Sequence, residues 1–134
     1  MTADELEGYV SKGGVYGRWA QRMLGKLAAG ETFPKSFPYT VQVWKLGQNH
    51  HWISLGGEAV VDYSPKFKAL YGPDTWVSGF AADLTAYIPS RRVWNEGGYE
   101  GGALGEYGLP AMRWSPDLED RITATVARLM EKVK

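Results

Sequence analysis

A strand-like run ends in two glycines and is followed at once by a lone glutamate, Glu58, in the segment LGGEAVVDYS. A second strand-like run leads into residues 81–114, which are rich in glycine, tyrosine and tryptophan. Polar side chains held just past strand ends, on backbone shaped by glycine, commonly form the sites of α/β proteins. The sequence therefore predicts an α/β chain whose functional residues lie between Leu55 and Tyr107.

Hydrophobic periodicity predicts a helix at each end of the chain. Apolar residues recur at three- and four-residue spacing through the first 30 residues, with Gly13 and Gly14 separating this helix from an irregular start. In the C-terminal segment, Ser115 is expected to cap a helix that has Pro116 in its first turn. These two helices should flank the rest of the fold.

Strand signals lie between the two helices. Residues 39–46 and 51–55 are predicted to form an antiparallel hairpin, and residues 76–80 a third strand. Together these segments predict a small mixed sheet with an antiparallel hairpin in an α/β fold, an α+β sandwich.

Two connecting segments are harder to assign. Residues 58–71 keep helical spacing, and Pro65 either kinks one helix or follows a cap at Ser64. Residues 81–114 have no sustained periodicity, which predicts a long loop rich in glycine and aromatic residues. The candidate functional residues Glu58, Tyr99 and Tyr107 lie in these two segments.

Length and composition narrow the class of protein. The 134 residues fit a single domain, residues 1–134, and the equal numbers of basic and acidic residues, 15 each, give no case for binding nucleic acid. The absence of cysteine excludes disulfides and thiolate metal sites. No apolar run is long enough for a transmembrane segment, and the N-terminus lacks the pattern of a signal peptide. The sequence leaves the cellular compartment open.

Three residues are the main candidates for chemistry. Glu58, expected where a strand meets a helix, could bind a metal or act as a base, or could only complement the helix dipole, which is worth about 0.3–1 kcal/mol. Tyr99 and Tyr107 could donate a hydrogen bond to an oxyanion or bind a metal, or could be amphipathic packing residues.

Other polar residues have simpler interpretations. His50 and His51 are neighbours on a strand and point to opposite faces, so they are not expected to share one metal. Arg91 and Arg92 are expected to make solvated or structural pairs, and Asp83 is expected to cap a turn. The nucleophile-elbow, zincin and P-loop motifs are all absent from the chain.

An ordered set of segments resembles the neutral/alkaline, non-lysosomal ceramidase family. The segments are PYTVQVWKLG with ISLGGEAVVDYS, then TWVSGFAADLTAYIPSRRVW, then NEGGYEGG and EYG. They span about residues 36 to 110. The family consists of zinc-dependent amidases that cleave the N-acyl bond of ceramide. The resemblance implies that Glu58 is the glutamate ligand of zinc and that Tyr107 is a catalytic hydrogen-bond donor near the scissile amide. It also implies that either Tyr99 supplies the tyrosine ligand or the site has diverged.

The chain departs from the family pattern at two points. Trp94 stands where the family has the first of two loop tyrosines, and the zinc-binding histidines of the family's upstream half have no counterpart. The resemblance therefore implies a C-terminal portion of a catalytic domain, inactive alone, with an upstream half or a homodimer through an open sheet edge as its partner. The alternative is a non-catalytic α/β module that binds an apolar ligand or a protein through its aromatic loop.

Overall fold

The computed structural model describes residues 1–133 and divides them into two compact units. The first unit contains residues 1–37 and 103–114, and the second contains residues 38–102 and 115–134, the last of which is outside the described residues. Within residues 1–133, no helix is both long and apolar enough to cross a membrane. The single domain expected from the length of the chain stays a prediction.

The first unit is a helical hairpin with a short segment from later in the chain. Its elements are α1 (Ala3–Lys12), α2 (Gly14–Ala28) and the 3-10 helix η1 (Leu104–Tyr107). α1 begins in a capping box: the Thr2 hydroxyl accepts from the Glu5 backbone N–H, and the Glu5 carboxylate accepts from Thr2 N–H at 2.7 Å. This cap explains why the chain is helical before Gly13, where the sequence predicted an irregular start.

The core of the first unit is centred on Trp19 of α2, which is fully buried beside Leu6, Ala20 and Met23. The Trp19 indole N–H donates to the carbonyl of Leu109 at 2.8 Å. This bond attaches the segment after η1 to the helical hairpin.

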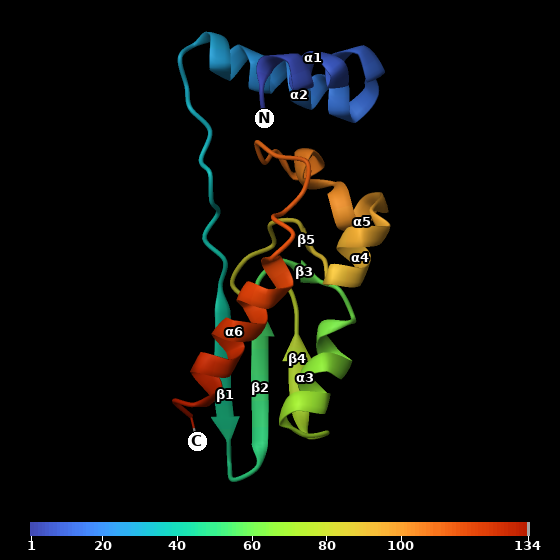
Figure 1. Ribbon diagram of the computed structural model, residues 1–134. Helices are drawn as coiled ribbons and strands as arrows, with labels where there is room; N and C mark the ends of the chain where they lie inside the picture. Colours follow the sequence, from blue (N-terminus) through green and yellow to red (C-terminus); the bar gives the residue numbers. More distant parts are fainter. Residues whose placement is uncertain (134) are drawn as a thin grey trace. The chain divides into compact units, whose positions relative to one another are not determined.

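The second unit is built on a three-stranded mixed sheet with the order β1-β2-β4 (Figure 1). β1 (Val41–Leu46) and β2 (His50–Leu55) form the expected antiparallel hairpin, and β4 (Thr75–Ser78) pairs parallel to β2. α3 (Tyr63–Tyr71) packs against β4, and α6 (Leu118–Met130) packs against β1. The α+β class predicted from the sequence is confirmed.

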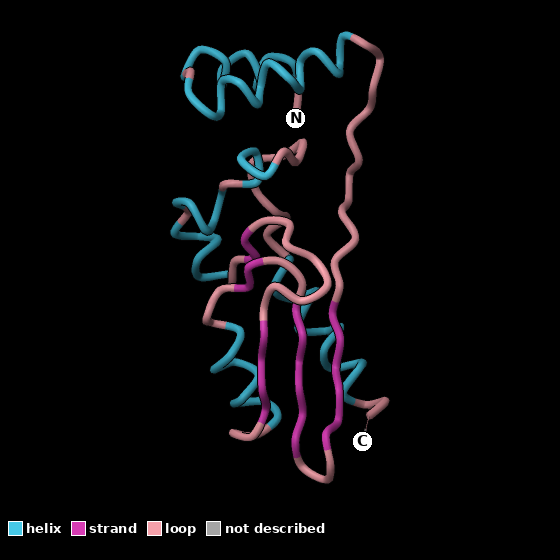
Figure 2. Tube along the Cα trace, turned by 180° about the vertical axis from the view of Figure 1, so that it is seen from behind, coloured by secondary structure: helices cyan, strands magenta, loops and turns pink. Residues whose placement is uncertain are grey.

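Both helices of this layer cover the same face of the sheet. Figure 2, which shows the unit from behind, has the three strands in front of α3 and α6. The buried apolar residues between sheet and helices take alternate positions in β2, although Ser54 between them is also buried, and they recur along the helices. They include Ile53, Leu55, Phe67, Ile122 and Val126.

The two connecting segments differ from the sequence prediction. Glu58 lies in a two-residue strand, β3 (Glu58–Ala59), and does not begin a helix, so its assignment to a helix N-terminus was wrong. α3 begins later, after Asp62, and Pro65 sits in its first turn, where the backbone N–H groups have no intrahelical partner to lose. Neither the kink at Pro65 nor the cap at Ser64 is present.

Residues 81–114 contain more regular structure than the sequence predicted. They form β5 (Tyr87–Ile88), α4 (Arg91–Glu96), α5 (Gly98–Gly102) and η1. Each element is too short to produce a repeating hydrophobic pattern. α6 also begins two residues later than expected: Asp117 is its N-cap residue, and the Ser115 hydroxyl bonds to the Asp117 carboxylate.

Candidate functional site

Glu58 and Tyr87 are paired across the small parallel sheet formed by β3 and β5 in the second unit. The carboxylate of Glu58 accepts a hydrogen bond from the Tyr87 side chain, and this bond is the main reason why the pKa of Tyr87 is raised. Partial desolvation and the charge of Glu58 act in the same direction. The pair therefore holds the phenol proton between two oxygen atoms.

The backbone before Glu58 has no room for any residue but glycine. Gly57 has φ +62°, and a Cβ atom built there would lie 2.8 Å from the Ala86 carbonyl oxygen and 2.9 Å from that of Thr85. Glu58 N–H in turn donates to the Ala86 carbonyl at 2.9 Å. This close approach of two backbone segments brings Glu58 into register with Tyr87.

The segment that encloses Gly57 is strained. Three non-glycine residues in it, Phe80, Ala82 and Ala86, have φ values of 54°, 65° and 61°. Such left-handed residues are uncommon and cost about 1–3 kcal/mol each, so they persist where the surroundings enforce them. Here Phe80 N–H donates to the Gly57 carbonyl, and Gly57 N–H donates to the Asp83 carbonyl. Strain of this kind is often found at functional sites.

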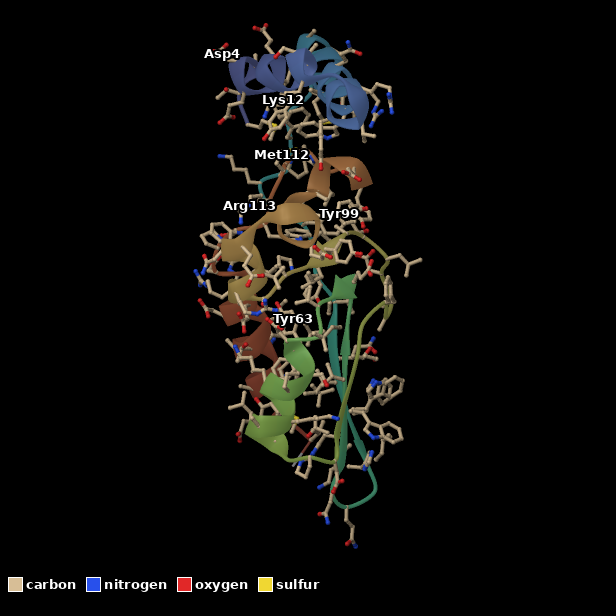
Figure 3. All side chains as sticks on the ribbon, turned by 90° about the vertical axis from the view of Figure 1, so that its right-hand side faces the viewer. Asp4, Lys12, Tyr63, Tyr99, Met112 and Arg113 are labelled. Atoms are coloured by element: carbon tan, nitrogen blue, oxygen red, sulfur yellow. The ribbon has the colours of Figure 1, made fainter. Side chains whose placement is uncertain are left out.

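Tyr99 is the second tyrosine of the site. It lies on α5 (Figure 3), and its ring stands edge-on to that of Tyr87, with the centroids 5.3 Å apart and an interplanar angle of 72°. The Tyr99 side chain is 48% exposed. Tyr99 and Glu100 both contribute to the raised pKa of Tyr87, so the site contains two phenols and two carboxylates.

Two neighbouring polar residues have structural roles. Asp83 accepts from the backbone N–H and the hydroxyl of Thr85, at 2.8 and 2.6 Å, and these bonds lower its pKa. This is the turn-capping role that the sequence predicted. Tyr39 donates to the Gly56 carbonyl at 2.8 Å, and burial raises its pKa. Both residues stabilise the backbone conformation of the segments next to Glu58.

The other sequence candidates belong to other elements. Tyr107 ends η1 in the first unit, and its role stays a prediction. His50 and His51 lie at the start of β2, and at about 3.3 Å per residue several steps of strand separate them from Gly56. Arg92 is bound to Asp62 and Glu96, and Arg91 to Asp120, so both arginines make structural pairs as predicted.

Tyr87 is the site residue that the sequence reasoning missed. The dipeptide Tyr87–Ile88 is too short for an alternating pattern, and only its pairing with Glu58–Ala59 shows that it is a strand. The available signal was weak: an aromatic and a β-branched residue directly before Pro89 are compatible with a short strand end.

The oxygen atoms of Glu58 and Tyr87 are of a kind that can bind a metal ion. Glu58 and Tyr87 offer a carboxylate and a phenol oxygen in contact, which suits a divalent cation such as zinc. Within residues 1–133, however, no three His, Asp or Glu side chains form a group that could hold a metal ion. A catalytic zinc generally has three protein ligands, and Glu58 and Tyr87 provide two oxygen groups.

The chain has no significant match among protein-family models, curated proteins or solved structures. What can be said of the chemistry of this site therefore rests on the residues that form it.

Proposed function

We propose that this chain is a segment of a ceramidase-like zinc amidase and supplies part of an active site for hydrolysing the N-acyl bond of ceramide or a related lipid. The observation that carries the proposal is the hydrogen-bonded pair of Glu58 and Tyr87 beside Tyr99. The resemblance of the ordered segments between residues 36 and 110 supports the same assignment.

The geometry refines the roles expected from the sequence. Because Tyr87 bonds directly to the Glu58 carboxylate, Tyr87 is a better second oxygen ligand than Tyr99. The half-exposed phenol of Tyr99 is then available to donate a hydrogen bond to a substrate carbonyl. Zinc held by Glu58 and Tyr87 together with ligands from elsewhere would act as a Lewis acid on the amide carbonyl of the substrate.

A partial ligand set predicts weak zinc binding with a characteristic pH dependence. Tyr87 has to lose its proton to bind a metal, and the pKa of Tyr87 is raised by the bond to Glu58. Zinc binding should therefore release a proton and should strengthen as the pH rises. Calorimetric titration with zinc in two buffers of different ionisation enthalpy measures both the affinity and the proton release.

The decisive comparison is between three variants. Glu58→Gln and Tyr87→Phe should each weaken zinc binding about tenfold or more, whereas Tyr71→Phe, which removes a phenol from α3, should leave it unchanged. Equal zinc binding in the wild type and in the first two variants contradicts the metal assignment. Hydrolysis of a fluorescent ceramide should be undetectable for the chain alone.

The second candidate function is a non-catalytic α/β module that binds an apolar ligand or a protein through its aromatic segment. The absence of a three-residue metal group from residues 1–133 and the exposed Tyr99 ring favour it. The same titration separates the two candidates, because this one predicts no zinc binding in the wild type.

A further inference from the structure

Three tryptophans form a row across the open face of the three-stranded sheet. Trp44 of β1 is the register partner of Trp52 of β2, and Trp52 is the register partner of Trp76 of β4. Neighbouring strands are about 4.8 Å apart, so the row crosses the sheet at right angles to the strands. The three side chains are 52%, 38% and 56% exposed.

No described helix of the second unit covers this face. α3 and α6 lie on the opposite face, and Figure 3 shows the sheet nearly edge-on with Tyr63 of α3 on the covered side. Side chains of the open face point away from these helices in the same view. The tryptophan row is therefore a surface feature of this unit and not part of its core.

The indole rings are held in place by polar contacts within the face. Trp52 Nε1–H donates to the Ser78 hydroxyl at 2.9 Å, and Trp44 Nε1–H donates to the Gln42 side chain at 3.4 Å. His50 stands edge-on to Trp76 with the ring centroids 4.4 Å apart. Covering the face would leave the N–H groups of Trp44 and Trp52 with their partners, so their burial costs little.

The face is uncharged. Side chains alternate along a strand, so the positions that share this face are Gln42, Trp44, Leu46, His50, Trp52, Ser54, Trp76 and Ser78. None of these positions in the described strands carries Asp, Glu, Lys or Arg. A nucleic acid or an anionic membrane binds through basic side chains, so neither is the expected occupant.

The exposed area of the tryptophan row fits the apolar core of a protein interface. With up to about 250 Å² for each tryptophan, the row exposes on the order of 350 Å², in the range of the largest functional patches on single proteins. A standard interface buries about 800 Å² on each partner and has an apolar core with a polar rim. The tryptophans and the exposed Leu46 supply such a core, and Gln42 and His50 lie in positions for the rim.

We propose that this face binds a second copy of the same chain in a twofold-symmetric, sheet-on-sheet dimer. A twofold axis parallel to the strands and above Trp52 places each Trp44 opposite the partner's Trp76 and each Trp52 opposite the partner's Trp52. The row is thus complementary to itself, as a twofold interface requires. The absence of charge means that no like charges meet when two copies pack face to face.

Sedimentation equilibrium over a range of concentrations tests the proposal. The wild type should dimerise, and the double variant Trp44→Ser/Trp76→Ser should dimerise about a hundredfold more weakly or not at all. The control variant Leu70→Ser removes an exposed apolar side chain from α3 and should dimerise like the wild type. Far-ultraviolet circular dichroism checks that each variant is folded.

A cross-linking experiment tests the orientation without substituting the tryptophans themselves. The chain has no cysteine, so single variants carry one thiol each. Gln42 and Ser78 flank the row at one level, and the proposed axis places each opposite the other in the second copy. A mixture of Gln42→Cys and Ser78→Cys chains should therefore react with a short bismaleimide to give mostly the mixed dimer.

Three results would overturn the proposal. They are a wild type that stays monomeric at high micromolar concentration, a dimer that persists in the double tryptophan variant, and cross-linking with no preference for the mixed pair. The second result would indicate pairing through a sheet edge. A monomer that binds uncharged oligosaccharides or neutral phosphatidylcholine vesicles through the tryptophans would assign the face to that ligand.

Discussion

Tyr87 donates a hydrogen bond to the carboxylate of Glu58, its register partner on the neighbouring strand. Each of these strands has only two residues, so the small sheet alone cannot hold the pair. The pairing depends on the strained segment before β5 and on the close backbone approach at Gly57. The geometry of the candidate site is therefore built by backbone contacts and not by side-chain packing alone.

Gly57→Ala should destabilise the second unit by about 3 kcal/mol. The new Cβ meets two backbone carbonyl oxygens at 2.8 and 2.9 Å, and the residue also keeps a left-handed φ. The matched control is Gly47→Ala, at φ +71° with no atom within 4 Å of the added Cβ, which should cost only about 1–2 kcal/mol. Urea unfolding measures both losses, and equal losses would mean that the contacts at Gly57 relax without cost.

Acid should weaken the second unit through Asp62. The pKa of Asp62 lies below its usual value of 3.8, first because Arg92 bonds to its carboxylate and then because Ser90 does so. A carboxyl with a lowered folded-state pKa stabilises the fold above its unfolded pKa, and this stability is lost as the pH falls through the folded pKa. Asp62 should therefore contribute at neutral pH and progressively less below 3.8.

Asp62→Asn tests this contribution. The variant should lose about 1 kcal/mol or less at neutral pH, because Arg92 is 59% exposed, and should differ little from the wild type in strong acid. Asp74→Asn changes an exposed carboxylate before β4 and should leave the acid dependence as it is in the wild type. If the acid unfolding curve of Asp62→Asn matched that of the wild type at every pH, Asp62 would be excluded as a source of the loss of stability in acid.

Trp19→Phe should destabilise the first unit by about 2 kcal/mol. The substitution removes the N–H donor of the Leu109 carbonyl and leaves space around a fully buried ring. Hydrogen exchange localises the effect, because amides of α1 and α2 should exchange faster while those of β2 do not change. Leu70→Ala, at an exposed position of α3 in the second unit, is the control and should be close to neutral.

Local patterns in the sequence predicted the elements that bury one continuous face. The strands β1 and β2 are long enough to show a hydrophobic period of two residues, and the helix α6 is long enough to show a period of three to four residues. The same reasoning failed for Glu58, because the helical spacing of residues 58–71 continued across the strand β3 into α3. It also failed before Gly13, where the capping box of Thr2 and Glu5 begins a helix of its own.

The sequence by itself determined the α+β class, the mixed sheet with its hairpin, and the helices that flank it, because these follow from short-range periodicity. It also identified Glu58 and Tyr99, which lie next to glycines in the sequence, as candidate functional residues. Only the tertiary structure decided that Tyr87 completes this group and that three tryptophans align on one open face. Both results depend on the pairing of strands that do not follow each other in the chain, β3 with β5 and β2 with β4, and no local pattern specifies such a register.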